Sequence, residues 1–409
     1  MSQIRRGPDA DEIERRVRDQ VTALTAIGLT PDEARLIAVR RLGAVEPATS
    51  TRTEMLVVLG LAVAAAVAIK LPELFGIAID EDGNEPFYFR NTSLFVLPLV
   101  AVYFVWKRGS GMVSGLWLAL PFAAAAVVAN VYAFPANSHT ELLLALHLPI
   151  ALWLAVGLGY VGSRWFAGDG RMNFVRFSGE LVIYYVLIAL GGGVLTGFTV
   201  MMFEAIGMDA EWFVGSWLVP CGAMGAVLVA SWLSETKQSI IGNMAPVLTR
   251  LFTPLFTILL LVFLGTMAWT GSAINVERDV LIAFDLLLVL VVGLVLYAAS
   301  ARDPQAPPDF FDGLQLLLVV SALVVDGVAL AAIAARISEF GFTPNRVAAL
   351  GENLILLVNL AGSAWLYAHF LRRRGSFAAL ERWQIAYLPV YSAWAALVVV
   401  LFPPLFGYR

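Results

Sequence analysis

Three apolar runs decide the fold of this chain: VLIAFDLLLVLVVGLVLY (280–297), LLLVVSALVVDGVALAAIAA (316–335) and the run that follows RISEFGFTPNR (336–346). Each approaches the ~20 residues that an α-helix needs to cross ~30 Å of hydrocarbon. The runs therefore predict consecutive membrane spans. Acidic residues interrupt all three runs, and an acidic side chain in hydrocarbon costs at least ~2.5–3.5 kcal/mol on insertion scales. We expect any functional residues to lie here.

Composition agrees with a membrane protein along the whole chain. The 409 residues are 59% hydrophobic and 14% charged, whereas soluble domains are about 45–50% apolar and about 25% charged. The net charge of −4 is too small to indicate a nucleic-acid partner. One cysteine and three histidines, without a close Cys/His pair, predict neither a metal site nor a cofactor. No cleaved signal peptide is expected at the N-terminus.

The sequence predicts an all-α, polytopic membrane protein with about eleven transmembrane helices. The expected spans are 55–75, 92–107, 111–132, 141–161, 179–203, 211–233, 250–271, 279–299, 313–336, 346–371 and 384–406. Several contain proline, and Pro220 is the strongest expected helix break.

The links between the spans indicate an orientation. Alternate links are basic, such as RRRGSFAALER (372–382), and the others are mainly acidic, such as IDEDGNEPFYFR (79–90). Because cytoplasmic links carry the excess of Lys and Arg, this pattern places the N-terminus in the cytoplasm. Eleven spans then place the C-terminus outside.

Residues 1–50 form a separate unit ahead of the bundle at 51–409. Residues 9–43 show two amphipathic helical patterns, and the second begins with Thr30 as N-cap, Pro31 at the first helical position and Glu33 completing a capping box. We therefore expect a small cytoplasmic helical hairpin. So few residues bury little surface on their own, which predicts that the hairpin binds a cytoplasmic partner or another copy of the chain.

The hairpin resembles a known domain. GLTPDEARLIAVRRLG (28–43), preceded by EIERRVRDQ (12–20), is similar to the permease-prefix (HAAS-type) domain of bacterial membrane proteins. The resemblance implies an N-terminal domain ahead of a permease-like bundle in the bacterial inner membrane.

A second resemblance lies late in the chain. ARISEFGFTPNRVAALGENLILL (335–357) resembles a family of bacterial multi-pass proteins known as a domain of unknown function, which carries an Arg-Ile…Tyr-Gly-Leu-Thr…Arg signature between late spans. Phe340 stands here in place of the usual Tyr. This resemblance implies an architecture and no activity.

A set of polar residues within the spans forms the first candidate site: Asp285, Asp326, Glu352, Asn359 and His147. At 1.5 Å per residue, Asp285, Glu352 and His147 lie ~9 Å below the expected outer surface. Asp326 and Asn359 lie near the middle of the bilayer. If their helices adjoin, they line a polar cavity whose floor binds protons. Alternatively, each forms an interhelical hydrogen bond that only stabilises the bundle.

A second candidate site lies in the link between the last two of the three runs. Thr343 is a good N-cap for a helix that begins at Pro344, and Arg336 and Arg346 flank the link. A helix N-terminus with nearby arginines suits an anion or a lipid headgroup. The alternative is that both arginines extend to the membrane interface or neutralise nearby acids.

Motifs of soluble enzymes such as HExxH, GxSxG and the Walker loop are missing from the sequence, so we expect no enzyme. The number of spans and the titratable set favour a permease-like protein that moves a small solute coupled to protons. The alternative is a regulatory or scaffolding membrane protein that acts through residues 9–43.

Overall fold

The computed structural model describes residues 19–25, 48–79, 83–162, 169–205, 211–236, 244–270 and 278–409. The chain forms two units, Met1–Gly60 and Leu61–Arg409. In the first unit the described residues are a helical segment at 19–25 and the beginning of α3. Most of the expected hairpin at 9–43 therefore lies outside the described residues.

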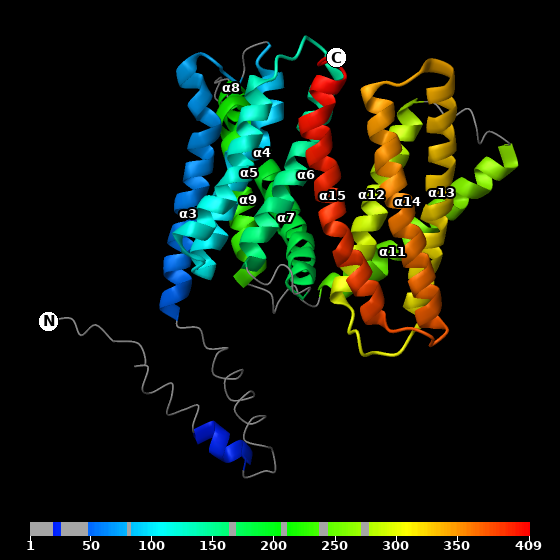
Figure 1. Ribbon diagram of the computed structural model, residues 1–409. Coiled ribbons are helices and arrows are strands. Elements are labelled where there is room, and N and C mark those ends of the chain that lie inside the picture. Colours follow the sequence, from blue (N-terminus) through cyan, green and yellow to red (C-terminus); the bar gives the residue numbers. More distant parts are fainter. Residues whose placement is uncertain are drawn as a thin grey trace. The chain divides into compact units, whose positions relative to one another are not determined.

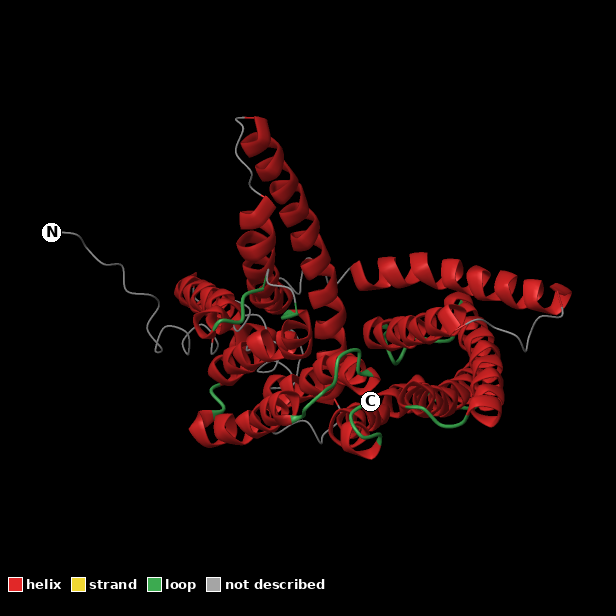
Figure 2. Ribbon diagram, turned by 90° about the horizontal axis from the view of Figure 1, so that it is seen from above, coloured by secondary structure: helices red, strands yellow, loops and turns green. Residues whose placement is uncertain are grey.

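All regular structure in the described residues is helical, and loops join the helices (Figures 1 and 2). The long helices are α3 (Ala48–Lys70), α4 (Glu85–Arg108), α5 (Gly111–Val131), α6 (His139–Val161), α7 (Asp169–Ala205), α9 (Val219–Thr236), α11 (Met244–Thr270), α12 (Arg278–Ala301), α13 (Phe310–Phe340), α14 (Pro344–Leu371) and α15 (Phe377–Leu405). The short turn η1 (Leu71–Phe75) extends α3. The short turns α8 (Glu211–Phe213) and η3 (Val214–Leu218) precede α9.

Each of the eleven predicted spans falls on a helix. Ten helices of the described residues are long and apolar enough to cross a membrane. The predicted span at 279–299 lies in α12. The chain is therefore a polytopic α-helical membrane protein.

Within the second unit, α15 (red in Figure 1) lies between two groups of helices. The first group contains α4, α5, α6, α7 and α9, and the second contains α11, α12, α13 and α14. Helix α15 packs against α6 of the first group and against α14 of the second. In the second group α13 packs against α11, α12 and α14, around buried apolar residues that include Leu288, Leu318 and Leu360. These contacts bring the three apolar runs of the opening stretch together.

Two glycines of α14 allow α15 to approach closely. A Cβ atom on Gly351 would overlap the Trp394 ring, and one on Gly362 would overlap the Trp383 ring. The indole Nε1 of Trp383 donates to the Asn359 carbonyl oxygen at 3.1 Å. Small residues at interfaces are a common means of close helix packing in membranes.

The expected break at Pro220 takes the form of a widened turn. Pro220 has no N–H to donate to the carbonyl of Ser216 four residues earlier, and η3, which contains Ser216, is a π-helix. The ammonium group of Lys70 donates to that carbonyl at 2.8 Å and lies 4.3 Å from the centre of the Trp217 ring. Lys70 thus supplies this carbonyl with a donor in place of the missing proline N–H, and the helix continues through the turn.

Candidate functional site

His147 on α6 and Glu352 on α14 are in direct contact. The Nε2 atom of His147 lies 2.5 Å from Oε1 of Glu352. The histidine is buried, whereas the Glu352 side chain is 31% exposed. The sequence placed these two residues at the same expected depth, and in the structure they join α6 of the first group to α14 of the second.

The other ring nitrogen of His147 determines the chemistry of this contact. Nδ1 lies 2.8 Å from the carbonyl oxygen of Leu143, one turn earlier on α6. A carbonyl oxygen only accepts, so Nδ1 carries a hydrogen and donates it. The hydrogen bond between Nε2 and Glu352 then requires one further proton, on either the imidazole or the carboxyl group. The pair consequently holds one exchangeable proton.

Asp285 on α12 is joined to α14 through Asn353. The amide Nδ2 of Asn353 donates to Oδ1 of Asp285 at 2.8 Å and to the carbonyl of Ala349 at 2.8 Å. Asn353 is fully buried, and within the described segments its Oδ1 has no hydrogen-bond partner. A buried amide oxygen without a partner is costly, which leaves an acceptor ready for a donor such as water.

Asp326, in the middle of α13, is the most isolated of the acidic residues. Its exposed fraction is 0%, and neither carboxyl oxygen has a hydrogen-bond partner among the residues that the structure describes. Leaving a buried polar group unpaired costs about 1–3 kcal/mol, and more for a charged group. The structure therefore shows Asp326 closed to solvent and without a visible structural role.

The four titratable groups form a series. Asp326 interacts electrostatically with Asp285, which in turn interacts with Glu352, the partner of His147. The Glu352 side chain is 31% exposed, Asp285 is half-buried and Asp326 is 0% exposed. Such a series can receive a proton at its exposed end and pass it inward.

Asn359 belongs to a different cluster. Its Nδ2 donates to Oε1 of Gln384 on α15 at 3.3 Å, and the Gln384 amide donates to Ser363 Oγ at 2.7 Å. The Ser363 hydroxyl donates to the Asn359 carbonyl oxygen at 2.7 Å. All three residues are buried. This closed network fits the structural alternative for Asn359, because it uses the polar groups to bind α14 to α15.

The candidate anion site has the predicted helix cap, but its Arg346 guanidinium binds backbone carbonyls. Thr343 is the N-cap of α14, and its hydroxyl accepts from the Arg346 backbone N–H at 3.4 Å. The Arg346 guanidinium donates to the carbonyls of Phe340 and Gly341 at 3.1 and 2.9 Å. Arg336 lies half-buried near the end of α13. Arg346 thus stabilises the turn between α13 and α14.

Sequence reasoning missed two residues of these clusters, Asn353 and Gln384. Asn353 directly follows Glu352, so the pair Glu-Asn inside an apolar run was the available signal. Gln384 stood at the expected beginning of the last span and was therefore not placed inside the bundle. The structure places it in α15, fully buried.

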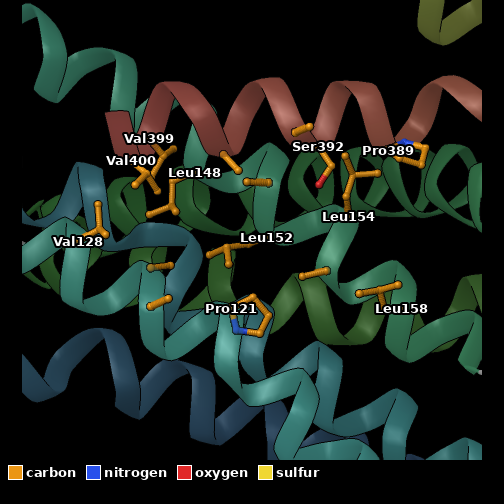
Figure 3. Close-up of a pocket in the computed structure, with 16 residues that line it drawn as sticks. Pro121, Val128, Leu148, Leu152, Leu154, Leu158, Pro389, Ser392, Val399 and Val400 are labelled. Atoms are coloured by element: carbon orange, nitrogen blue, oxygen red, sulfur yellow. The ribbon is translucent and has the colours of Figure 1, made fainter. Parts of the chain in front are cut away.

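An apolar cavity of ≈ 500 Å³ lies between α5, α6 and α15 (Figure 3). Pro121, Leu152 and Val399 are among its lining residues, and Ser392 is its polar one. Water needs two to four polar partners, which this lining does not supply. The cavity is therefore separate in chemistry from the acidic series.

The described residues contain no group of three or more His, Cys, Asp or Glu side chains arranged to hold a metal ion. Comparisons with protein-family models, curated proteins and solved structures found no match.

Proposed function

We propose that this membrane protein is permease-like and moves a small solute, and that proton binding at Asp326 is coupled to the movement. The observation that carries the proposal is the Asp326 carboxyl group, fully buried in mid-helix with both oxygens unpaired. An isolated carboxylate in a buried apolar site is avoided by neutralisation. Releasing the proton then requires access to water, and so a different packing of α13.

The acidic series supplies the route for the proton. Glu352 is partly exposed and shares a proton with His147, while Asp285 is within electrostatic range of Glu352 and of Asp326. Ionisable residues within spans commonly form proton relays in transporters. We assign entry to the His147–Glu352 pair and the coupling step to Asp326.

Loop charges and resemblance support the cellular setting. The basic links favour a cytoplasmic N-terminus and an outer C-terminus. The similarity of residues 12–43 to the permease-prefix domain supports the bacterial inner membrane. That hairpin then offers a surface for a cytoplasmic partner or for self-association.

Infrared difference spectroscopy tests the proton-binding step. The purified chain in lipid nanodiscs is titrated between about pH 5 and pH 9, as wild type and as Asp326→Asn. We expect a protonated-carboxyl band that changes with pH and is missing in the variant. Glu180→Gln is the matched control, because Glu180 is equally buried but accepts a hydrogen bond from Ser234 at 3.4 Å.

A spectrum that does not change with pH, or a band that survives in Asp326→Asn, would overturn the proposal. That outcome would favour regulation or scaffolding. A positive result leads to vesicles with an imposed pH gradient and a screen of small solutes. There, Asp326→Asn must abolish uptake that the Glu180→Gln variant retains.

A further inference from the structure

A polar cavity of ≈ 210 Å³ lies where α4, α6, α7 and α9 come together, away from the acidic series. Its lining combines Arg108, Tyr160, Asn173, Arg176 and Glu235 with few apolar groups. These residues come from distant parts of the sequence, and no sequence pattern links them. The cavity is at the ends of its helices, since Arg108 closes α4 and Asn173 stands in the second turn of α7.

The two arginines of this cavity are held in different ways. Arg108 donates to Oε1 of Glu235 at 2.7 Å, and its guanidinium lies 4.9 Å from the centre of the Tyr160 ring. Arg176 donates to the Ser300 carbonyl from Nε, at 3.0 Å, and from Nη2. The ion pair with Glu235 offsets the charge of Arg108. The neutral Ser300 carbonyl orients Arg176, and the Glu180 carboxylate, one turn along α7 and without a salt bridge to it, only partly offsets its charge.

Arg176 is therefore pre-organised to receive an anion. In the described part of the chain its guanidinium has no salt bridge, and its Nη1 group has no hydrogen-bond partner. Glu180, one turn along α7, is buried, accepts from Ser234 and does not line the cavity. Asn173 is exposed and adds an amide donor.

We propose that this cavity binds a phosphate group, held by Arg176 and Asn173 and bounded by the Arg108–Glu235 pair. Guanidinium groups bind phosphate through paired, charge-assisted hydrogen bonds. Basic pockets between transmembrane helices at the membrane surface are typical sites for phosphate-bearing headgroups. The phosphate belongs to a bilayer lipid or is free in solution, and the experiment separates these sources. The site is independent of transport.

Thermal unfolding of the full chain in a neutral detergent tests the site. The probes are dioleoyl-phosphatidylglycerol, dioleoylglycerol, which lacks the phosphate, and inorganic phosphate. We expect phosphatidylglycerol to raise the unfolding midpoint and dioleoylglycerol not to do so. The apparent affinity should fall about tenfold in Arg176→Gln, equivalent to about 1.4 kcal/mol, and should also fall in Asn173→Ala.

Arg346→Gln is the control, because it removes an arginine at another helix end whose guanidinium already binds carbonyls. It should bind phosphatidylglycerol as the wild type does. An equal midpoint shift with inorganic phosphate would identify free phosphate as the source, and a shift with phosphatidylglycerol alone would identify the lipid. Equal stabilisation by dioleoylglycerol, or full binding in Asn173→Ala together with Arg176→Gln, would overturn the proposal.

Discussion

Two aspartates on α13 have the same burial and opposite surroundings. Asp312, in the first turn, is 1% exposed, and Asp326, in the middle of the helix, is 0% exposed. Arg302 donates to both oxygens of Asp312 at 2.8 Å, from Nε and Nη2. Neither oxygen of Asp326 has a hydrogen-bond partner. Burial alone therefore does not show what a membrane acid is for.

The surroundings of Asp312 explain its burial completely. Its carboxylate also accepts a hydrogen bond from the backbone N–H of Asp309 at 2.9 Å. In return, the Asp309 carboxylate accepts one from the backbone N–H of Asp312 at 3.0 Å, which caps α13. The Arg302 guanidinium stacks on Phe370 and Phe377, at 4.7 and 4.4 Å from the ring centres. Such pairing offsets the cost of burying charge. Asp326 has no comparable compensation in the described part of the chain, and a buried acidic group without a partner inside a membrane span is a functional candidate.

The largest effect is expected from Asp312→Asn. The change leaves the half-buried Arg302 charge without its partner, and because breaking a fully buried ion pair costs about 3–5 kcal/mol, we expect a loss near the lower end of that range. Denaturant unfolding in detergent micelles measures the free energy. Asp303→Asn is the control, because Asp303 is exposed on the same loop. Equal stability of the two variants would contradict a structural role for Asp312.

Asp326→Val should raise the free energy of unfolding, whereas Asp312→Asn lowers it. The substitution removes two unpaired buried oxygens, so the free energy of unfolding should rise by about 1–3 kcal/mol while the pH-dependent carboxyl band disappears. Asn359→Leu, which breaks the closed network with Gln384, should lower it by a similar amount. If Asp326→Val is as destabilising as Asn359→Leu, Asp326 has a structural partner after all.

Breaking the His147–Glu352 pair should change the free energy of unfolding by an intermediate amount. A double-mutant cycle with His147→Phe and Glu352→Gln should give a coupling energy of about 1 kcal/mol, reduced by the partial exposure of Glu352. Because Nδ1 already donates to Leu143, the contact between Nε2 and Glu352 depends on one shared proton. A coupling energy of zero would rule out a hydrogen bond between these two side chains.

Arg346→Gln should have the smallest effect, within about 0.5 kcal/mol. Its guanidinium binds two carbonyls of a partly exposed turn, and glutamine retains one donor group there. The thermal unfolding midpoint measures the change. A loss of several kcal/mol would show that this turn, like the loop around Arg302, is a principal support of α13.

Local features were predictable from the sequence. Helix α14 begins at Pro344 behind the Thr343 cap, as the Thr-Pro pair indicated. The equal depth of His147 and Glu352 followed from counting residues along two spans. The loop at 300–313 was interpreted only as a link between spans, because its spacing gives no sign that Arg302 folds back onto Asp312. Asn353 and the Arg108–Arg176 cavity were missed for the same reason.

The sequence by itself determined that the chain crosses the membrane many times and where the helices run. Crossing hydrocarbon depends on the hydropathy of about 20 consecutive residues, which is a local property. Only the tertiary structure decided that Asp312 is paired, that Asp326 is alone and that Arg176 faces a polar cavity. Partners are set by which helix faces pack together, and that packing depends on side chains far apart in the chain.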